Sequence, residues 1–276
     1  MAAAAGLGIA SAGGGFGIDE VTAAAQDGAG VDQPLGWTPV NADEMRRKAR
    51  ENYYAGMHCA EGVAHTLIAS QRGNGSGWDD VPSIAAWWGA GGGAKNGVLC
   101  GTITGGSTVA ALAFGRSGTT MKIVNEIHQR YQQTKFPQYE PPSDSEQGMT
   151  LDLAANRSKS PLCHVSVTKW CKTTGYAWSS AERAERCSRV AADMAGMVTE
   201  LLNAEVNGNW DKVASEVPEV DAVDPENGCV SCHAAGNDFE QGGFVQTKMS
   251  CPECHGMAPH LPSSLQSGGG GGTFPP

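Results

Sequence analysis

Apolar and polar positions alternate along residues 41–208 with the period of helices, and strand signals are almost absent. Asn41 followed by Glu44 is a helix-start signature, and the segment 42–72 predicts two helices or one helix bent at Gly56. Further helices are expected at 84–88 after Pro82, at 100–114, at 120–131 and from Ser160-Pro161 to near Gly175, with a loop over 138–160.

The last predicted helix carries the clearest apolar face. Ser179 with Glu182 forms a capping pattern at its start, and Asn207-Gly208 ends it. Between these ends one helical face collects Cys187, Val190, Ala191, Met194, Val198, Leu201 and Leu202. Beyond Val213 the periodicity stops and the Gly, Pro and Cys content rises. The sequence therefore predicts a mainly α protein, with a helical Cys-rich domain over 41–208 and an irregular, cofactor-dependent segment over 209–262.

The two ends of the chain have low sequence complexity. Residues 1–25 are mostly small and apolar and close on Ala23-Ala24-Ala25, which suggests the remnant of an export signal without its basic leading region. A flexible Ala/Gly arm is the alternative. Residues 263–276 are Gly-rich and end in Pro-Pro, which predicts a flexible tail. The export hypothesis predicts a periplasmic protein.

Charge and hydropathy exclude some classes of partner. The chain has 276 residues, with 19 Lys and Arg against 29 Asp and Glu, a formal net charge of -10. It shows no basic stripe, so nucleic-acid binding is not supported. No apolar run reaches the roughly 18–20 residues of a membrane span. Nine cysteines are too many for an ordinary cytosolic protein and require a chemical explanation.

Four of these cysteines lie in two Cys-x-x-Cys-His motifs, which are formed by Cys229, Cys232 and His233 and by Cys251, Cys254 and His255. This is the attachment pattern of c-type haem. Two thiols with that spacing reach the two vinyl groups of one porphyrin, and the adjacent histidine can bind the iron. Two c-type haems per chain are therefore predicted, with His233 and His255 as iron ligands, and the short gap between the motifs holds the haems close together.

Two other interpretations compete for these motifs. Two Cys-x-x-Cys pairs also fit a zinc ribbon, and Cys-Pro-Glu-Cys suggests a thiol redox site. Histidine makes up only 7 of 276 residues, so a histidine directly after both pairs favours haem, because a zinc ribbon needs neither. No helix signal follows the second pair, which argues against the thiol redox site.

The sequence offers several candidates for the sixth ligands of the haem irons. Five histidines remain, of which His58 and His164 are favoured because each adjoins a cysteine, with His260 close behind. Met257 is a further candidate and would raise the potential.

The remaining cysteines, Cys59, Cys100, Cys163, Cys171 and Cys187, fall on predicted helices. Buried inert thiols are one interpretation, and ligands of an iron–sulfur cluster are the other. Cys163 and Cys171 would lie about 12 Å apart along one straight helix, which a binuclear cluster cannot easily span. Either one of them is not a ligand, or the helix breaks between them.

These motifs resemble the redox-active cysteine family named for its C, GCAxxG, C, C pattern. The resemblance rests on Cys59, the Gly-rich run 91–93, Cys100-Gly101 with Gly105, Cys163 and Cys187. With the two haem motifs, the chain resembles the split-Soret cytochromes c over roughly 41–262. That resemblance implies a homodimer, edge-to-edge haems with bis-His iron, and a cluster, [2Fe-2S] favoured, held by Cys59, Cys100, Cys163 and Cys187. Thr102 and the extra thiol of Cys171 depart from the pattern.

Three functions are compatible with these features. An exported electron-transfer protein with unidentified redox partners is favoured, because no Ser/His/Asp series, Walker loop or nucleotide fingerprint is present. A haem- or cluster-dependent reductase would need an open iron coordination site. A zinc-stabilised module without haem is the third possibility, together with a haem-based sensor.

Overall fold

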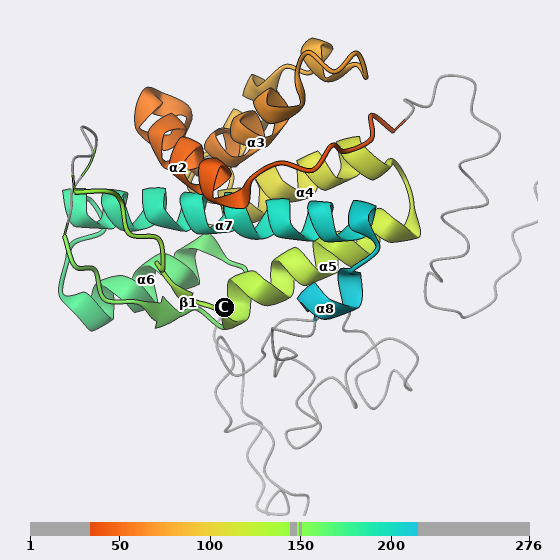
Figure 1. The fold of residues 1–276 in the computed structure, drawn as a ribbon. Coiled ribbons are helices and arrows are strands. Elements are labelled where there is room, and N and C mark those ends of the chain that lie inside the picture. Colours follow the sequence, from red (N-terminus) through yellow and green to blue (C-terminus); the bar gives the residue numbers. More distant parts are fainter. Residues whose placement is uncertain (1–33, 144–147, 149–150, 215–276) are drawn as a thin grey trace, which may run out of the picture.

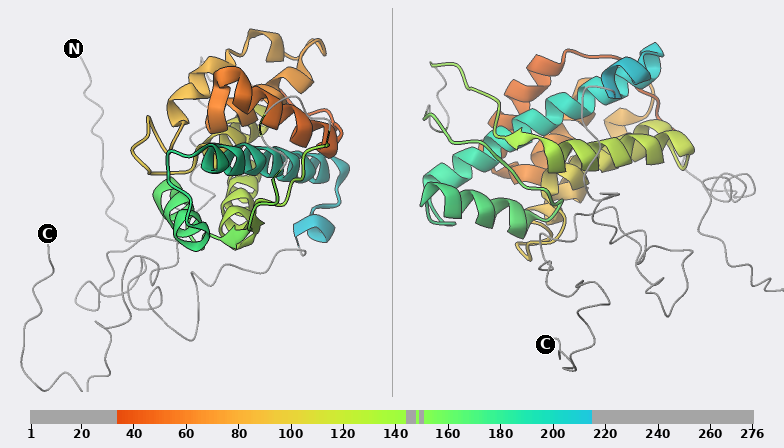
Figure 2. Two further views of the ribbon diagram at one scale, coloured as in Figure 1. Left: turned by 90° about the vertical axis from the view of Figure 1, so that its left-hand side faces the viewer. Right: turned by 90° about the horizontal axis from the view of Figure 1, so that it is seen from below.

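The longest helix, α7 (Ala181–Asn207), runs through the middle of the fold in the computed structural model, which describes residues 34–143, 148 and 151–214 (Figure 1). It contacts α2 (Ala42–Asn52), α3 (His58–Gln71), α4 (Gly101–Phe114) and α5 (Gly118–Gln133). Seen nearly along its axis, α7 is surrounded by these helices (Figure 2). The described part of the chain is mainly helical, as the sequence predicted.

The first predicted helical segment is bent at the expected glycine. Asn41 caps α2 by accepting a hydrogen bond from the Glu44 amide at 2.9 Å. A short π-helical turn, η1 (Tyr53–Met57), then joins α2 to α3, and Gly56 adopts a φ of 94° within it. A left-handed φ costs glycine little, which explains why the helix breaks at this position. His58, the first residue of α3, also has a positive φ of 56°.

Two short 3-10 helices, η2 (Trp78–Asp80) and η3 (Ser83–Gly89), connect α3 to the glycine-rich loop before α4. The sequence predicted an ordinary helix at 84–88, with Pro82 in its first turn; Pro82 instead caps a 3-10 helix. The turn ends at Gly89 because three residues with positive φ follow at 91–93.

The loop predicted at 138–160 contains little regular structure in its described residues. The two-residue strands β1 (Lys135–Phe136) and β2 (Asn156–Arg157) pair antiparallel at its ends. Helix α6 (Cys163–Thr174) then runs to Gly175, whose φ of 79° ends it. A short helix, α8 (Trp210–Ala214), packs against α7 beyond the predicted helical end at Gly208.

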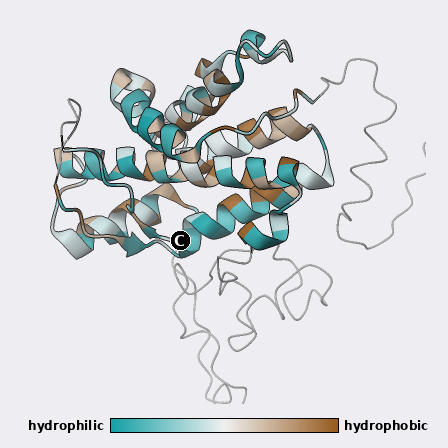
Figure 3. Cartoon of the chain, in the orientation of Figure 1, coloured by the Kyte–Doolittle hydropathy of each residue, from teal (hydrophilic) through white to brown (hydrophobic). Residues whose placement is uncertain are grey.

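The α7 helix begins one residue later than predicted. Ser180, not Ser179, is the N-cap, and its hydroxyl accepts a hydrogen bond from the Arg183 amide at 3.2 Å. The predicted end at Gly208 is confirmed. Bands of hydrophobic and hydrophilic residues alternate along α7 in Figure 3. Its predicted apolar face is buried at Val190, Ala191, Met194, Val198, Leu201 and Leu202. Within the described residues, no helix is long and apolar enough to cross a membrane.

Candidate functional site

A cavity of about 750 Å³ lies where the starts of α3, α4 and α6 meet the first turns of α7. We call it the cysteine cavity. The sequence-predicted residues that line it are Cys59, Cys100, Cys163, Cys187, His58 and His164. Cys171 lies further along α6 and does not line it. The fold thus gathers the four cysteines of the family pattern and leaves out the extra one, while α6 stays unbroken between Cys163 and Cys171.

A short backbone ladder fixes two of these cysteines beside each other. The Cys100 amide donates to the carbonyl of Pro161 at 2.9 Å, and the Cys163 amide donates to the carbonyl of Val98 at 2.7 Å. The His164 amide donates to the Gly97 carbonyl at 2.9 Å. The two segments therefore pair antiparallel, and Cys100 and Cys163 each stand at the start of a helix that this pairing positions.

Glycines line the close approaches of the chain to these side chains. A Cβ at Gly101 would lie 2.6 Å from the Cys59 sulfur, and one at Gly92 would lie 2.7 Å from the Cys163 Cβ. Gly92 also has a φ of 74°, which a side chain would strain. Gly92 and Gly101, two of the glycines that carried the family resemblance, are thus explained by sterics, because larger residues would displace Cys163 and Cys59.

The thiols lie close enough together to affect one another electrostatically. Burial raises the pKa of the Cys59 thiol to about 12, and the neighbouring Cys100 and Cys187 contribute to that rise. Burial also raises the pKa of Cys163, with Cys100 and Cys187 again contributing. The thiols of Cys59 and Cys163 therefore stay protonated at neutral pH unless a cation binds them, because metal binding drives thiol deprotonation.

Both candidate histidines in the cysteine cavity are exposed to solvent as well as lining it. The His58 ring packs edge-on against Tyr53, with 5.7 Å between ring centroids. The Nδ1 atom of His164 lies 3.5 Å from the hydroxyl of Thr168. Both imidazole rings are exposed, so their nitrogen atoms are accessible to an iron outside the helical domain.

Sequence reasoning missed two buried polar side chains in the cavity wall. Arg186 is 2% exposed, and Tyr131 is fully buried on α5. Arg186 donates to the Ser166 hydroxyl at 2.7 Å, and its Nη1 lies 3.9 Å from the Cys187 sulfur. The Arg186 Nε and the Tyr131 hydroxyl have no hydrogen-bond partner. No signal in the sequence identified them, because both positions fall in ordinary helical pattern.

The cysteine cavity fits a thiolate-bound group of several atoms. Over residues 34–143, 148 and 151–214, no three His, Cys, Asp or Glu side chains converge closely enough to hold a single metal ion. Four free thiols instead surround a volume much larger than one ion. The orphaned Arg186 Nε and Tyr131 hydroxyl supply polar contacts that such a group would use.

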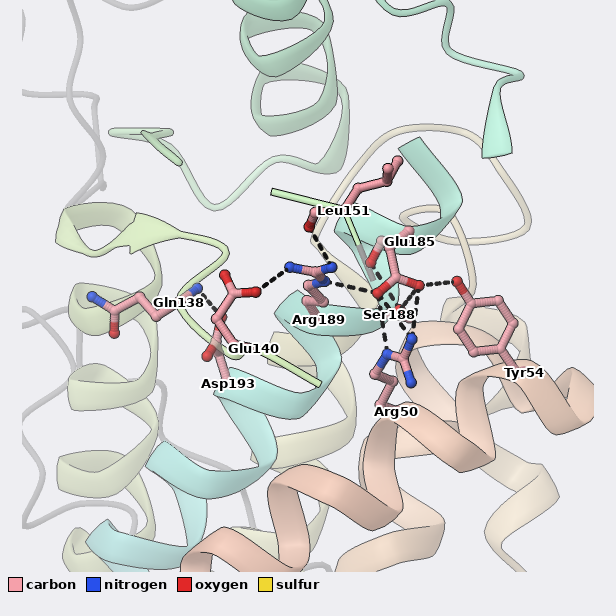
Figure 4. Close-up of polar contacts among 9 residues, drawn as sticks. All are labelled: Arg50, Tyr54, Gln138, Glu140, Leu151, Glu185, Ser188, Arg189 and Asp193. Carbon is pink, nitrogen blue, oxygen red and sulfur yellow. Dashed lines mark hydrogen bonds and ion pairs between the residues drawn. The ribbon is translucent and has the colours of Figure 1, made fainter. Parts of the chain in front are cut away.

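A second buried polar cluster adjoins the cysteine cavity on α7 and is self-contained. We call it the Glu185 network (Figure 4). Glu185, which is fully buried, accepts hydrogen bonds from Arg50 at 3.0 Å and from Arg189 at 2.7 Å, and a further one from the Tyr54 hydroxyl. Arg189 also donates to Glu140 at 2.8 Å. The buried charges of Arg50, Glu185 and Arg189 therefore each have an opposite charge beside them.

The predicted haem residues Cys229, Cys232, His233, Cys251, Cys254 and His255, and the candidate ligand His260, lie outside the described residues. The domain boundaries predicted at 1–25, 209–262 and 263–276 also fall wholly or mostly outside them. These assignments remain sequence predictions.

A helical domain that brings four cysteines from four elements to one cavity defines a redox-active cysteine protein. Residues 57–201 match the family model described as "Putative redox-active protein (C_GCAxxG_C_C)". The chain is also 32% identical over 230 residues to the split-Soret cytochrome c of Desulfovibrio desulfuricans, covering 82% of this chain and 79% of the relative. The chain therefore belongs to the split-Soret cytochrome c family.

A solved structure agrees with this membership. This structure describes a novel iron centre in the split-Soret cytochrome c from Desulfovibrio desulfuricans ATCC 27774, and the two folds match with a TM-score of 0.73 at 28% identity. The match covers 87% of this chain and 99% of the solved one. The family makes the chain a cytochrome c-type, iron-binding redox protein.

Proposed function

We propose that this chain is an exported electron-transfer protein that carries two c-type haems and an iron–sulfur cluster, with [2Fe-2S] favoured. The observation that carries the cluster is the meeting of Cys59, Cys100, Cys163 and Cys187 in the cysteine cavity. Four thiolates are the usual ligand set of such clusters. The cavity volume and the lack of a converged single-ion site favour a polynuclear group over zinc.

The chain's own residues would hold and shield this cluster. The four cysteines supply the ligands, and the cluster when bound supplies a reversible one-electron couple. The glycine loop before α4 covers the cavity closely, because Gly92 lies against Cys163 and Gly101 against Cys59. Buried Tyr131 and Arg186 exclude water from the inner wall.

The haem part of the proposal rests on the two Cys-x-x-Cys-His motifs of the sequence. His58 and His164 support it from the helical domain, because both are exposed beside the cysteine cavity. An iron bound by either ring would stand next to the cluster, which suits electron transfer between the two kinds of centre. The two c-type haem motifs and the signal-like residues 1–25 support export to the periplasm. The family resemblance supports a homodimer.

The proposal is tested by expressing the full chain with c-type haem maturation machinery. A pyridine haemochrome assay is expected to count two covalent haems per chain, and iron and acid-labile sulfide beyond the haems are expected in equal amounts. Ser substitutions at Cys59, Cys100, Cys163 and Cys187, one at a time, should remove the sulfide while leaving both haems attached.

Cys171→Ser is the matched control, because Cys171 lies on the same helix as Cys163 but does not line the cavity. It should retain full sulfide content. Equal loss in Cys171→Ser and Cys163→Ser would contradict the ligand assignment. Absence of covalent haem, with zinc bound instead, would overturn the cytochrome assignment for residues 229–255.

A further inference from the structure

The charged side chains that line the cysteine cavity are all positive. Its lining residues include the cations Lys95, Arg183 and Arg186, and they include no aspartate or glutamate. This occurs in a chain whose formal net charge is -10. Lys95 is exposed and Arg183 is half-buried, so water screens both. Arg186 is not screened, because only 2% of it is exposed.

Arg186 makes no ion pair with a carboxylate anywhere in the described part of the chain. Its hydrogen-bond partners are the Ser166 hydroxyl at 2.7 Å and the Cys187 sulfur at 3.9 Å, and the buried carboxyl of Asp193 acts on it without forming an ion pair. Its Nε is buried without a partner. Isolated buried charges cost several kcal/mol, so native proteins pair them or use them to bind a counter-charge. A buried arginine without an ion pair is stabilised by negative charge placed in the cavity that it lines.

We propose that Arg186 is the counter-charge of the thiolate-bound centre and raises its reduction potential. This inference rests on the proposed cluster. Reduction adds one electron from a donor, such as dithionite, and no bond is made or broken. The reduced centre is more negative by one charge, so a fixed positive charge stabilises it more than the oxidised centre. Net charge and hydrogen bonding near the sulfurs are known determinants of cluster potentials.

The first test is a redox titration of the loaded full-length protein, with the cluster followed by electron paramagnetic resonance. Arg186→Met removes the charge at similar side-chain length, and Arg186→Gln is a second neutral variant that can still donate to Ser166. At the wild-type midpoint, each should show a reduced-to-oxidised ratio at least tenfold lower, equivalent to about 59 mV for one electron.

Two further variants separate charge from packing. Arg186→Lys keeps the positive charge, so its midpoint potential should stay close to that of the wild type. Arg47→Gln removes an exposed cation that pairs with Glu51 on α2, far from the cavity wall, and should leave the potential unchanged. A midpoint unchanged in both neutral variants, or a shift in Arg186→Lys as large as theirs, would overturn the proposal.

The second test uses the full chain before cluster loading, and does not depend on the cluster. Without the negative centre Arg186 has no ion-pair partner, so Arg186→Met should raise the thermal unfolding temperature of the unloaded protein and lower that of the loaded protein. If wild type takes up no iron and sulfide, the proposed cluster fails, while the unloaded comparison still reports on Arg186. An unloaded Arg186→Met no more stable than wild type would show that the charge is already compensated.

Discussion

Glu185 and Arg186 are neighbours on α7, yet they lie in two regions that treat buried charge in opposite ways. Glu185 is surrounded by Arg50, Arg189 and Tyr54, so its charge is neutralised within the fold. Arg186 lines a cavity with four thiols and no carboxylate, and it forms no ion pair with Asp193, the buried acid that senses its charge. In the Glu185 network the buried arginines and the glutamate form ion pairs without any bound group. In the cysteine cavity the buried cation Arg186 has no ion-pair partner. Completeness of charge pairing thus distinguishes the region that supports the fold from the region that we propose binds a cluster.

The largest expected effect comes from breaking the complete region. Glu185→Gln would leave Arg50 and Arg189 close together without the carboxylate that separates them, which should cost about 3–5 kcal/mol in the free energy of unfolding. Urea unfolding measures this loss. Glu51→Gln removes half of an exposed helix pair with Arg47 and should cost less than about 1 kcal/mol. Equal losses in the two variants would mean that the network adds nothing beyond a surface pair.

The next effect concerns the geometry of the incomplete region. Gly101→Ala would place a methyl group 2.6 Å from the Cys59 sulfur and 2.7 Å from the Gly89 carbonyl oxygen. We expect a loss of about 2–3 kcal/mol from overpacking, together with loss of bound sulfide. Gly62→Ala is the control, because its Cβ would meet its nearest atom at 3.4 Å. Normal sulfide content in Gly101→Ala would show that the cavity tolerates a displaced Cys59.

The smallest expected effect concerns Asp193, a buried acid between the two regions. It accepts a hydrogen bond from the Gln138 amide at 2.8 Å, and burial raises its pKa from 3.8 to about 6. The folded state therefore keeps this proton between pH 4 and 6, where the unfolded chain has lost it. The stability that Asp193 contributes falls as the pH rises through this window and stays low above it.

Asp193→Asn should remove this dependence and stabilise the protein by about 2 kcal/mol at pH 7.5, since the amide carries no charge and its oxygen can still accept from Gln138. Paired urea titrations at pH 4.5 and pH 7.5 measure the difference, which should be much smaller at the lower pH. A gain that is the same at both pH values would contradict a raised pKa for Asp193.

Local signals predicted most of the helical fold. The Asn41 cap, the bend at Gly56 and the end of α7 at Gly208 follow from backbone chemistry within a few residues, so they can be seen in the sequence. The 3-10 character of η3 could not be predicted, because the loop of positive-φ residues after Gly89 imposes it. The one-residue error at Ser180 arose because Ser179 and Ser180 are both good caps.

The candidate site was predicted only in part. Its cysteines were predicted; helix length indicated that Cys163 and Cys171 would not both be ligands on one unbroken helix, and the family resemblance selected Cys163. Arg186 was missed because its burial depends on Ser166 of α6 and on the wall formed by Tyr131, which are distant in sequence. A long charged side chain on a helix is normally solvated, so only the packed structure distinguishes this arginine from its exposed neighbours.

The ladder between residues 97–100 and 161–164 also constrains when the centre can assemble. Cys100 and Cys163 come together only after α4, α5 and the long loop have closed the chain between them, and Cys187 must arrive on α7. Closing such a loop is slow compared with local structure formation. Each Cys-x-x-Cys-His motif, by contrast, contains its attachment residues within five positions. The proposed haem sites could thus form on a nascent segment, whereas the proposed cluster site exists only in the finished fold, so we expect haem attachment to precede loading of the cavity.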